Sequence, residues 1–242
     1  MAGCLLAALF SFAQTPQQIE SDLLKSFKKI DPYKGSDDNT YSNDIFLKKL
    51  YNYTTHNPET IAYPFNSLKK GHLEINTSDD SVLRIYSWDT WTGGTMHFFD
   101  SIFQYRVDNK TYSVIDTATE GDVEPLYDKL YMFKRPEKTY YLTTYDGVGS
   151  TSDRFSGITI FAIINGKLDT HVKLIKTASG LHSSISYEYN FFSVLNWKVQ
   201  PAISFDTKTQ TIRIPVVGDK GEMTHNYIIY KFTGQYFERI KN

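Results

Sequence analysis

Hydrophobic positions near the start of the chain follow a helical period. Between residues 16 and 30 they recur every three or four residues and form one apolar stripe, made of Ile19, Leu23, Leu24, Phe27 and Ile30. Thr15 is a suitable N-cap, Pro16 suits the first helical position, and Gln18 completes a capping box. This pattern predicts a helix that begins at Pro16 and ends before Asp31-Pro32.

A second amphipathic helix is predicted from about Asn43 to Tyr53, with Phe46, Leu47 and Leu50 on its buried face. The polar run 35–40 is interpreted as the loop that ends the first helix. Residues 14–70 are therefore expected to form a helical lead-in. Both helices need an apolar surface to cover, and the most direct one is a face or edge of the region that follows.

From about Leu73 the period changes to two, which is typical of strands. Residues 82–86 and 103–107 alternate in this way. Short turns at Asp108-Asn109, Asn165-Gly166 and Thr233-Gly234 separate later runs. Residues 71–242 are thus predicted to form one antiparallel β domain. The fold class is mainly β, either a meander or sandwich or a propeller-like sheet, with the two N-terminal helices packed on it.

Composition and charge narrow the choice of partners. Aromatic residues make up 15% of the chain, with 18 Tyr and 16 Phe, which favours half-buried pleated surfaces. The formal net charge is −1, and Lys and Arg form no local run. We therefore expect no nucleic acid and no anionic membrane surface as a partner. No stretch has the length and hydrophobicity of a membrane span.

The first thirteen residues are uncharged and mostly apolar, with small residues at Ser11 and Ala13. This pattern predicts a secretory signal peptide at 1–13, cleaved before Gln14, and hence a secreted or periplasmic location. Cleavage would remove Cys4, the single cysteine of the chain. The basic residues that usually open such a peptide are missing, which leaves open whether the natural start lies upstream of Met1. The alternative interpretation is a buried apolar N-terminal helix.

The stretch from Ser81 to Val107 holds the strongest candidate site. Two of the three tryptophans, the one Gly-Gly pair and a histidine fall within ten of its residues, between two predicted strands. Indole faces beside carboxylate and hydroxyl groups suit a sugar ring, which stacks on the aromatic face and hydrogen-bonds through its hydroxyls. The predicted ligand-binding residues are Trp88, Asp89, Trp91, Arg84, Thr95 and His97. The alternative is that Trp88 is a core residue and Asp89 caps the turn.

Motifs for other chemistry are missing from the sequence. No HExxH, CxxC, EF-hand, P-loop or GxSxG pattern occurs, so we expect no metal, no cofactor and no nucleophilic catalytic site. Paired carboxylates for a glycoside hydrolase could come from Asp89 and Asp100, or from the acidic run 116–124. That run is interpreted more simply as a solvated connection.

The run RIYSWDTWTGGTMHFF and the ending YKFTGQYF resemble segments of uncharacterised exported bacterial proteins. The resemblance implies a location in the cell envelope and carries no activity. The sequence therefore predicts an exported, non-catalytic binding module whose ligand is a glycan or an envelope protein. An inhibitor or immunity-type interaction module is the alternative, and a carboxylate-dependent glycoside hydrolase is a further one.

Overall fold

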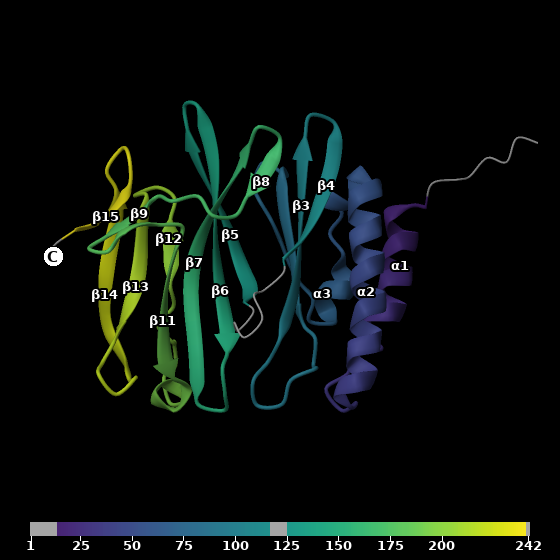
Figure 1. Cartoon of the computed structure of the whole chain (residues 1–242), viewed down its shortest axis with the longest axis horizontal. Helices are drawn as coiled ribbons and strands as arrows, with labels where there is room; N and C mark the ends of the chain where they lie inside the picture. Colours follow the sequence, from purple (N-terminus) through teal and green to yellow (C-terminus); the bar gives the residue numbers. More distant parts are fainter. Residues whose placement is uncertain (1–13, 117–124, 241–242) are drawn as a thin grey trace, which may run out of the picture.

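The structure is a computed structural model that describes residues 14–116 and 125–240. Its elements form successive layers, with helices at one side followed by three β-sheets (Figure 1). The predicted signal peptide, most of the acidic run 116–124 and the last two residues lie outside the described residues. Within the described part the sheets form stacked layers and not the closed ring of a propeller.

The helical layer begins with α1 (Pro16–Phe27), whose predicted capping box is confirmed. The side chain of Thr15 accepts from the backbone N–H of Gln18, and the Gln18 side chain accepts from the backbone N–H of Thr15 at 2.9 Å. The remaining helical elements are α2 (Ser36–His56), the 3₁₀ helix η1 (Pro58–Ile61) and the short α3 (Asn66–Lys70).

The second helix is longer than predicted, because the polar run 35–40 belongs to it. Asp37 and Asp38 lie in the first turn of α2, where negative charge is favoured by the helix dipole. Two other residues of this turn contact a distant loop: Ser36 donates to the carbonyl of Thr92, and Asn39 donates to the carbonyl of Trp91. The local pattern of hydrophobic and polar residues does not reveal these tertiary contacts.

The sheets are antiparallel apart from the pairing of β15 with β9. The first sheet has the order β1 (Glu74–Thr77), β2 (Leu83–Asp89), β3 (Phe99–Val107), β4 (Lys110–Asp116). The middle sheet has the order β11 (Ser184–Asn190), β7 (Asp153–Ile164), β6 (Lys138–Val148), β5 (Leu126–Arg135), with β8 (Lys167–Asp169) paired to β7. The third sheet has the order β10 (Gly180–His182), β9 (Ile175–Thr177), β15 (Phe237–Ile240), β14 (Met223–Phe232), β13 (Thr211–Val217), β12 (Ser204–Asp206).

Strand β2 shows why the layers stack, because every residue from Leu83 to Trp88 is buried. Successive side chains of a strand point to opposite faces. Leu83 and Ile85 pack against the middle sheet, whereas Tyr86 and Trp88 pack against the helices. A strand that is buried on both faces must lie between two layers.

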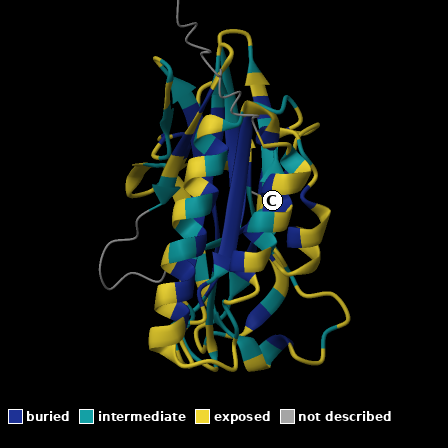
Figure 2. Cartoon of the chain, turned by 90° about the vertical axis from the view of Figure 1, so that its right-hand side faces the viewer, coloured by how far each residue is buried: buried dark blue, intermediate teal, exposed yellow. Residues whose placement is uncertain are grey.

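Three hydrophobic clusters join the layers. The first, between the helices and the first sheet, includes Leu23 and Phe46. The second, between the first and middle sheets, includes Phe103 and Phe161. The third lies between the middle and third sheets. Viewed from the helical side, the helices carry exposed residues outward and cover a buried strand behind them (Figure 2).

The three predicted tight turns are confirmed. They connect β3 to β4, β7 to β8, and β14 to β15. Asn165 and Gly166 both have positive φ, +51° and +76°, as this hairpin turn requires. The segment 167–177, which follows the Asn165-Gly166 turn, is divided between β8 in the middle sheet and β9 in the third. The chain crosses from one layer to the next within it.

Candidate functional site

The connection between β2 and β3, residues 90–98, is here called the Trp91 loop. Its base is closed by Thr90, whose backbone N–H and side-chain hydroxyl both donate to the carbonyl oxygen of Phe98, at 2.9 and 2.8 Å. The hydroxyls of Thr90 and Thr92 lie 2.8 Å apart. Gly93 permits a tight approach of the chain to itself, since a Cβ there would lie 2.0 Å from the carbonyl oxygen of Met96.

The backbone of Trp91 is held in an unusual conformation, with φ at +52°. A bulky residue rarely adopts this left-handed region, because its Cβ crowds the backbone. Its N–H donates to Oδ1 of Asp89 at 2.8 Å, and its carbonyl accepts from Nδ2 of Asn39 on α2 at 2.9 Å. Such strain persists where surrounding contacts over-determine it, and it clusters at functional sites.

Asp89 and His97 form a pair beneath the Trp91 side chain. Nδ1 of His97 lies 2.5 Å from Oδ2 of Asp89, and the ring centroids of His97 and Trp91 are 5.2 Å apart. The backbone N–H of His97 donates to the carbonyl of Val148 at the end of β6, at 3.1 Å. Asp89 thus orients the imidazole with one oxygen and fixes the Trp91 backbone with the other.

Three large apolar side chains of the loop remain exposed to solvent. The exposed fractions are 38% for Trp91, 38% for Met96 and 36% for Phe98. Sequence reasoning missed Met96 and Phe98. A signal was present, because Met96, Phe98 and Phe99 follow the Gly93-Gly94 pair within five residues.

More exposed apolar residues lie in and directly after η2 (Phe191–Val194), which follows β11 at the same end of the layered fold (Figure 1). Phe192 and Leu195 are 55% and 53% exposed. This segment is tied to the β6–β7 connection, because the backbone N–H of Phe191 donates to the carbonyl of Ser152 at 2.7 Å. Loops of the first and middle sheets therefore share one end of the molecule.

Two of the predicted site residues are buried and have structural roles instead. Trp88 is fully buried, its Nε1 donates to Oδ1 of Asn43 on α2 at 2.7 Å, and its ring meets Phe46 edge-on at 5.0 Å. Trp88 is therefore the core residue of the alternative interpretation. The reason is its register in β2, which directs it towards the helices.

Arg84 is also buried, with 3% of its surface exposed. Its Nη1 donates to the carbonyls of Thr60 and Tyr63, at 2.7 and 2.6 Å. Arg84 thus satisfies backbone groups of η1 and of the segment that joins η1 to α3, and it does not reach the surface of the Trp91 loop. Of the other predicted residues, Thr95 is exposed at the loop tip, and Asp89 and His97 are partly buried beneath Trp91.

Asp100 does not join Asp89 as a carboxylate pair. It lies opposite Trp88 in the β2–β3 register, and its Oδ2 accepts from Nδ2 of Asn43 at 2.5 Å. Burial raises the pKa of the Asp100 carboxyl above its usual value, while the hydrogen bond from Asn43 opposes that rise.

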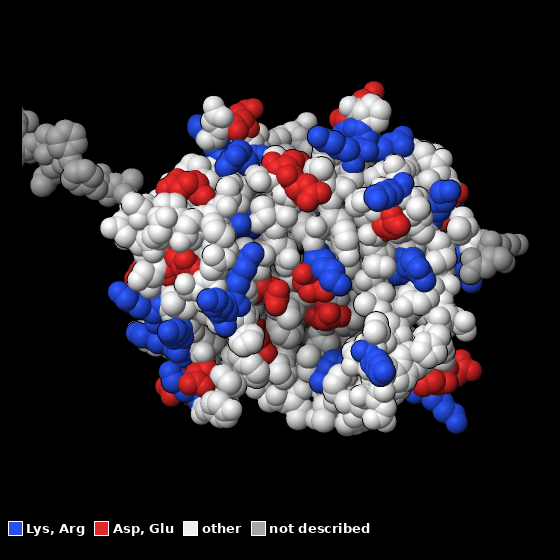
Figure 3. All heavy atoms as spheres, turned by 180° about the vertical axis from the view of Figure 1, so that it is seen from behind, with Lys and Arg blue, Asp and Glu red and all other residues white. Residues whose placement is uncertain are grey.

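Nothing in the described ranges suggests a metal centre: no group of three or more His, Cys, Asp or Glu side chains there could hold a metal ion. Lys and Arg are interspersed with Asp and Glu on the rear face, without a large area of one sign (Figure 3). None of the helices in residues 14–116 and 125–240 is long and apolar enough to cross a membrane.

The chain matches no protein family model and none of the curated proteins. Its function must therefore be inferred from the Trp91 loop and its surroundings.

Proposed function

We propose that this protein is a non-catalytic binding module that binds a protein ligand through the Trp91 loop. The observation that carries the proposal is the exposure of Trp91, Met96 and Phe98 together on one loop whose backbone is fixed. Trp, Phe and Met are enriched at protein interfaces, and an exposed apolar group of this kind marks an interaction site. A fixed loop loses little conformational entropy when it binds.

A protein ligand is favoured over a glycan because the polar groups beside the indole are already engaged. Both oxygens of Asp89 accept hydrogen bonds, one from the backbone of Trp91 and one from the ring of His97. The hydroxyls of Thr90 and Thr92 bond to one another. A sugar ring would have to replace these contacts to gain its own.

A catalytic role is less well supported. A glycoside hydrolase needs two carboxyl groups about 5–10 Å apart on either side of one bond. Asp100 is instead bonded to Asn43 under the helices, so Asp89 has no carboxylate partner in the loop. The Asp89–His97 pair resembles the base and orienting group of a catalytic triad. Because Asp89 also binds the backbone of Trp91, we assign the pair to loop support.

We further propose that the protein works outside the cytoplasm, either secreted or periplasmic. Support for this location comes from the apolar, uncharged residues 1–13 and the small residues before Gln14. An envelope protein is then the expected ligand, and inhibition of that protein is one role such a module could perform.

The proposal is tested by site-specific photocrosslinking in cells that produce the protein. A benzophenone amino acid in place of Met96 is expected to capture one discrete protein. The same probe in place of Tyr41, which is 71% exposed on α2, is the matched control and should not capture it.

Affinity for the captured protein then decides the role of the loop. Trp91→Ala should weaken binding by about 30-fold or more, as interface hot spots do, whereas Tyr33→Ala, at a site 96% exposed, should not. Equal affinity of Trp91→Ala and wild type would contradict the proposal. Titration with soluble cell-wall fragments tests for a glycan ligand. A saturable change in tryptophan fluorescence that Trp91→Ala abolishes would identify a glycan as the ligand instead of a protein.

A further inference from the structure

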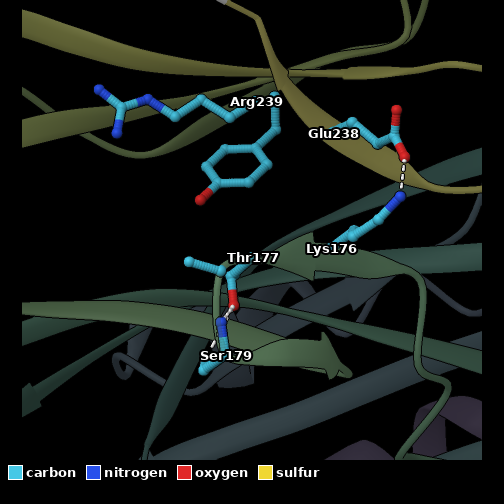
Figure 4. Close-up of a pocket in the computed structure, with 7 residues that line it drawn as sticks. Lys176, Thr177, Ser179, Glu238 and Arg239 are labelled. Atoms are coloured by element: carbon cyan, nitrogen blue, oxygen red, sulfur yellow. Dashed lines mark hydrogen bonds and ion pairs between the residues drawn. The ribbon is translucent and has the colours of Figure 1, made fainter.

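A cavity of about 630 Å³ opens at the third sheet, distant in the fold from the Trp91 loop. This volume falls within the range of about 300–1,000 Å³ that is typical of small-molecule sites. Its walls come from the β9–β10 hairpin and from β14 and β15 (Figure 4). The lining residues are Lys176, Thr177, Ala178, Ser179, Tyr230, Glu238 and Arg239.

The cavity exists because two neighbouring strands separate. The parallel pairing of β15 with β9 ends at Glu238 and Lys176. Beyond that point β9 turns into its hairpin through Ala178 and Ser179, whereas β15 continues beside β14 to Ile240. The space between the hairpin and Arg239 is left open, as Figure 4 shows for Arg239 above and Thr177 and Ser179 below.

The charged residues of the lining sum to one positive charge. Nζ of Lys176 lies 2.8 Å from Oε1 of Glu238, so these two charges offset one another. The hydrogen bond and the charge of Glu238 raise the pKa of Lys176, which keeps the ammonium protonated. Arg239 therefore supplies the net charge, and its guanidinium is suited to bidentate binding of a phosphate or carboxylate.

The two hydroxyls on the opposite wall of the cavity are hydrogen-bonded within their own hairpin (Figure 4). The hydroxyls of Thr177 and Ser179 lie 2.9 Å apart, and that of Ser179 lies 2.9 Å from Nε2 of His182. Tyr230 lines the cavity while its ring also belongs to the core cluster between the middle and third sheets. Within the described residues, the Tyr230 hydroxyl makes no hydrogen bond. The cavity thus combines one cation that is not offset by a carboxylate, the hydroxyl of Tyr230 and an aromatic wall.

We propose that this cavity binds a small organic anion, a molecule that carries one phosphate or carboxylate group on an apolar body. Arg239 pairs with the anionic group, and the hydroxyl of Tyr230 adds a hydrogen bond to it. The apolar body lies against Ala178 and the ring of Tyr230. This site shares no residue with the Trp91 loop, so each of the two proposals can be tested independently of the other.

The experiment is calorimetric titration of the full-length protein with phenyl phosphate, benzoate, inorganic phosphate and phenol. We expect saturable binding of phenyl phosphate or benzoate, and the stronger of the two identifies the preferred anion. Phenol lacks the anionic group and should bind at least about tenfold more weakly, since a charge-assisted hydrogen bond contributes about 1.5–3 kcal/mol. Absence of saturable binding of either anion up to about 10 mM would overturn the proposal.

Variants localise the binding. Arg239→Gln should weaken it by about tenfold, and Arg239→Lys, which keeps the charge but loses the planar fork, by less. Arg213→Gln is the matched control, because Arg213 lies on β13 of the same sheet over the ring of Tyr227 and outside the cavity. Equal binding by Arg239→Gln and wild type would contradict the proposed site. Circular dichroism verifies that each variant is folded.

Discussion

Nε1 of Trp88 donates a hydrogen bond to Oδ1 of Asn43 at 2.7 Å, and this contact connects β2, an inner strand of the first sheet, to α2. The amide of Asn43 also donates to Asp100 on the neighbouring strand, at 2.5 Å. One amide therefore satisfies both an indole and a carboxylate between two layers. Buried polar groups of this kind are costly when a partner is lost.

Asn43→Ala is expected to lower the free energy of unfolding by about 2–4 kcal/mol, because it leaves the Trp88 indole and the Asp100 carboxylate without their partner. Asn52→Ala, at an exposed position of the same helix, should change it by less than about 0.5 kcal/mol. Urea unfolding followed by circular dichroism measures both. Equal effects of the two substitutions would show that the buried contact contributes no stability.

The two adjacent glycines of the Trp91 loop should respond differently to alanine. A Cβ on Gly93 would lie 2.0 Å from the carbonyl oxygen of Met96, whereas one on Gly94 would meet nothing within 4 Å. Gly93→Ala is therefore expected to destabilise the protein by about 1–3 kcal/mol, and Gly94→Ala by less than about 0.5 kcal/mol. Thermal unfolding tests the contrast. A tolerated Gly93→Ala would mean that the loop relaxes without cost.

The left-handed backbone conformation of residue 91 predicts a difference in stability between two variants that both lack the indole. Trp91→Gly and Trp91→Ala both remove the indole, but only glycine adopts a φ of +52° without strain. Trp91→Gly should therefore be more stable than Trp91→Ala by about 1 kcal/mol. Chemical denaturation compares the two variants directly. If alanine proved the more stable, the backbone would not be held as the structure has it.

The burial of Asp100 predicts a pH dependence of known sign. Burial raises the pKa of its carboxyl in the folded state above the usual value. Its contribution to stability is therefore fully present below the unfolded pKa and is lost as pH rises through the folded pKa. Asn at this position does not titrate. Asp100→Asn should consequently become more stable relative to wild type between pH 4 and pH 8, as measured by urea unfolding across that range.

Asp206 serves as a control, because its pKa is shifted in the opposite direction to that of Asp100. Backbone hydrogen bonds, first from Thr209 and then from Lys208, lower its pKa. It therefore adds stability above its unfolded pKa, and that stability is lost as pH falls through the folded pKa. Asp206→Asn should become less stable relative to wild type as pH rises. Parallel trends for the two variants would refute the assignment of these shifts.

Local patterns determined much of the fold. The Thr15 capping box, the period of α1 and the Asn165-Gly166 turn depend on neighbouring residues, so the sequence alone was sufficient to predict them. The alternation through β2 likewise predicted a strand. These features share one physical cause, which is that backbone hydrogen bonding and side-chain direction repeat over a few residues.

Only the tertiary structure decided which residues of the candidate site are exposed. Alternation places Trp88 and Arg84 on one face of β2, but it does not reveal that α2 and η1 cover this face. Trp91 is three residues further along the chain, outside the strand, where Asn39 of α2 donates to its backbone carbonyl and its side chain is 38% exposed. The anion cavity depends even more on long-range contacts, since a parallel strand pair brings Lys176 beside Glu238 and so places the β9–β10 hairpin next to β15. Contacts between such distant segments arise from the packing of layers, which no short stretch of sequence encodes.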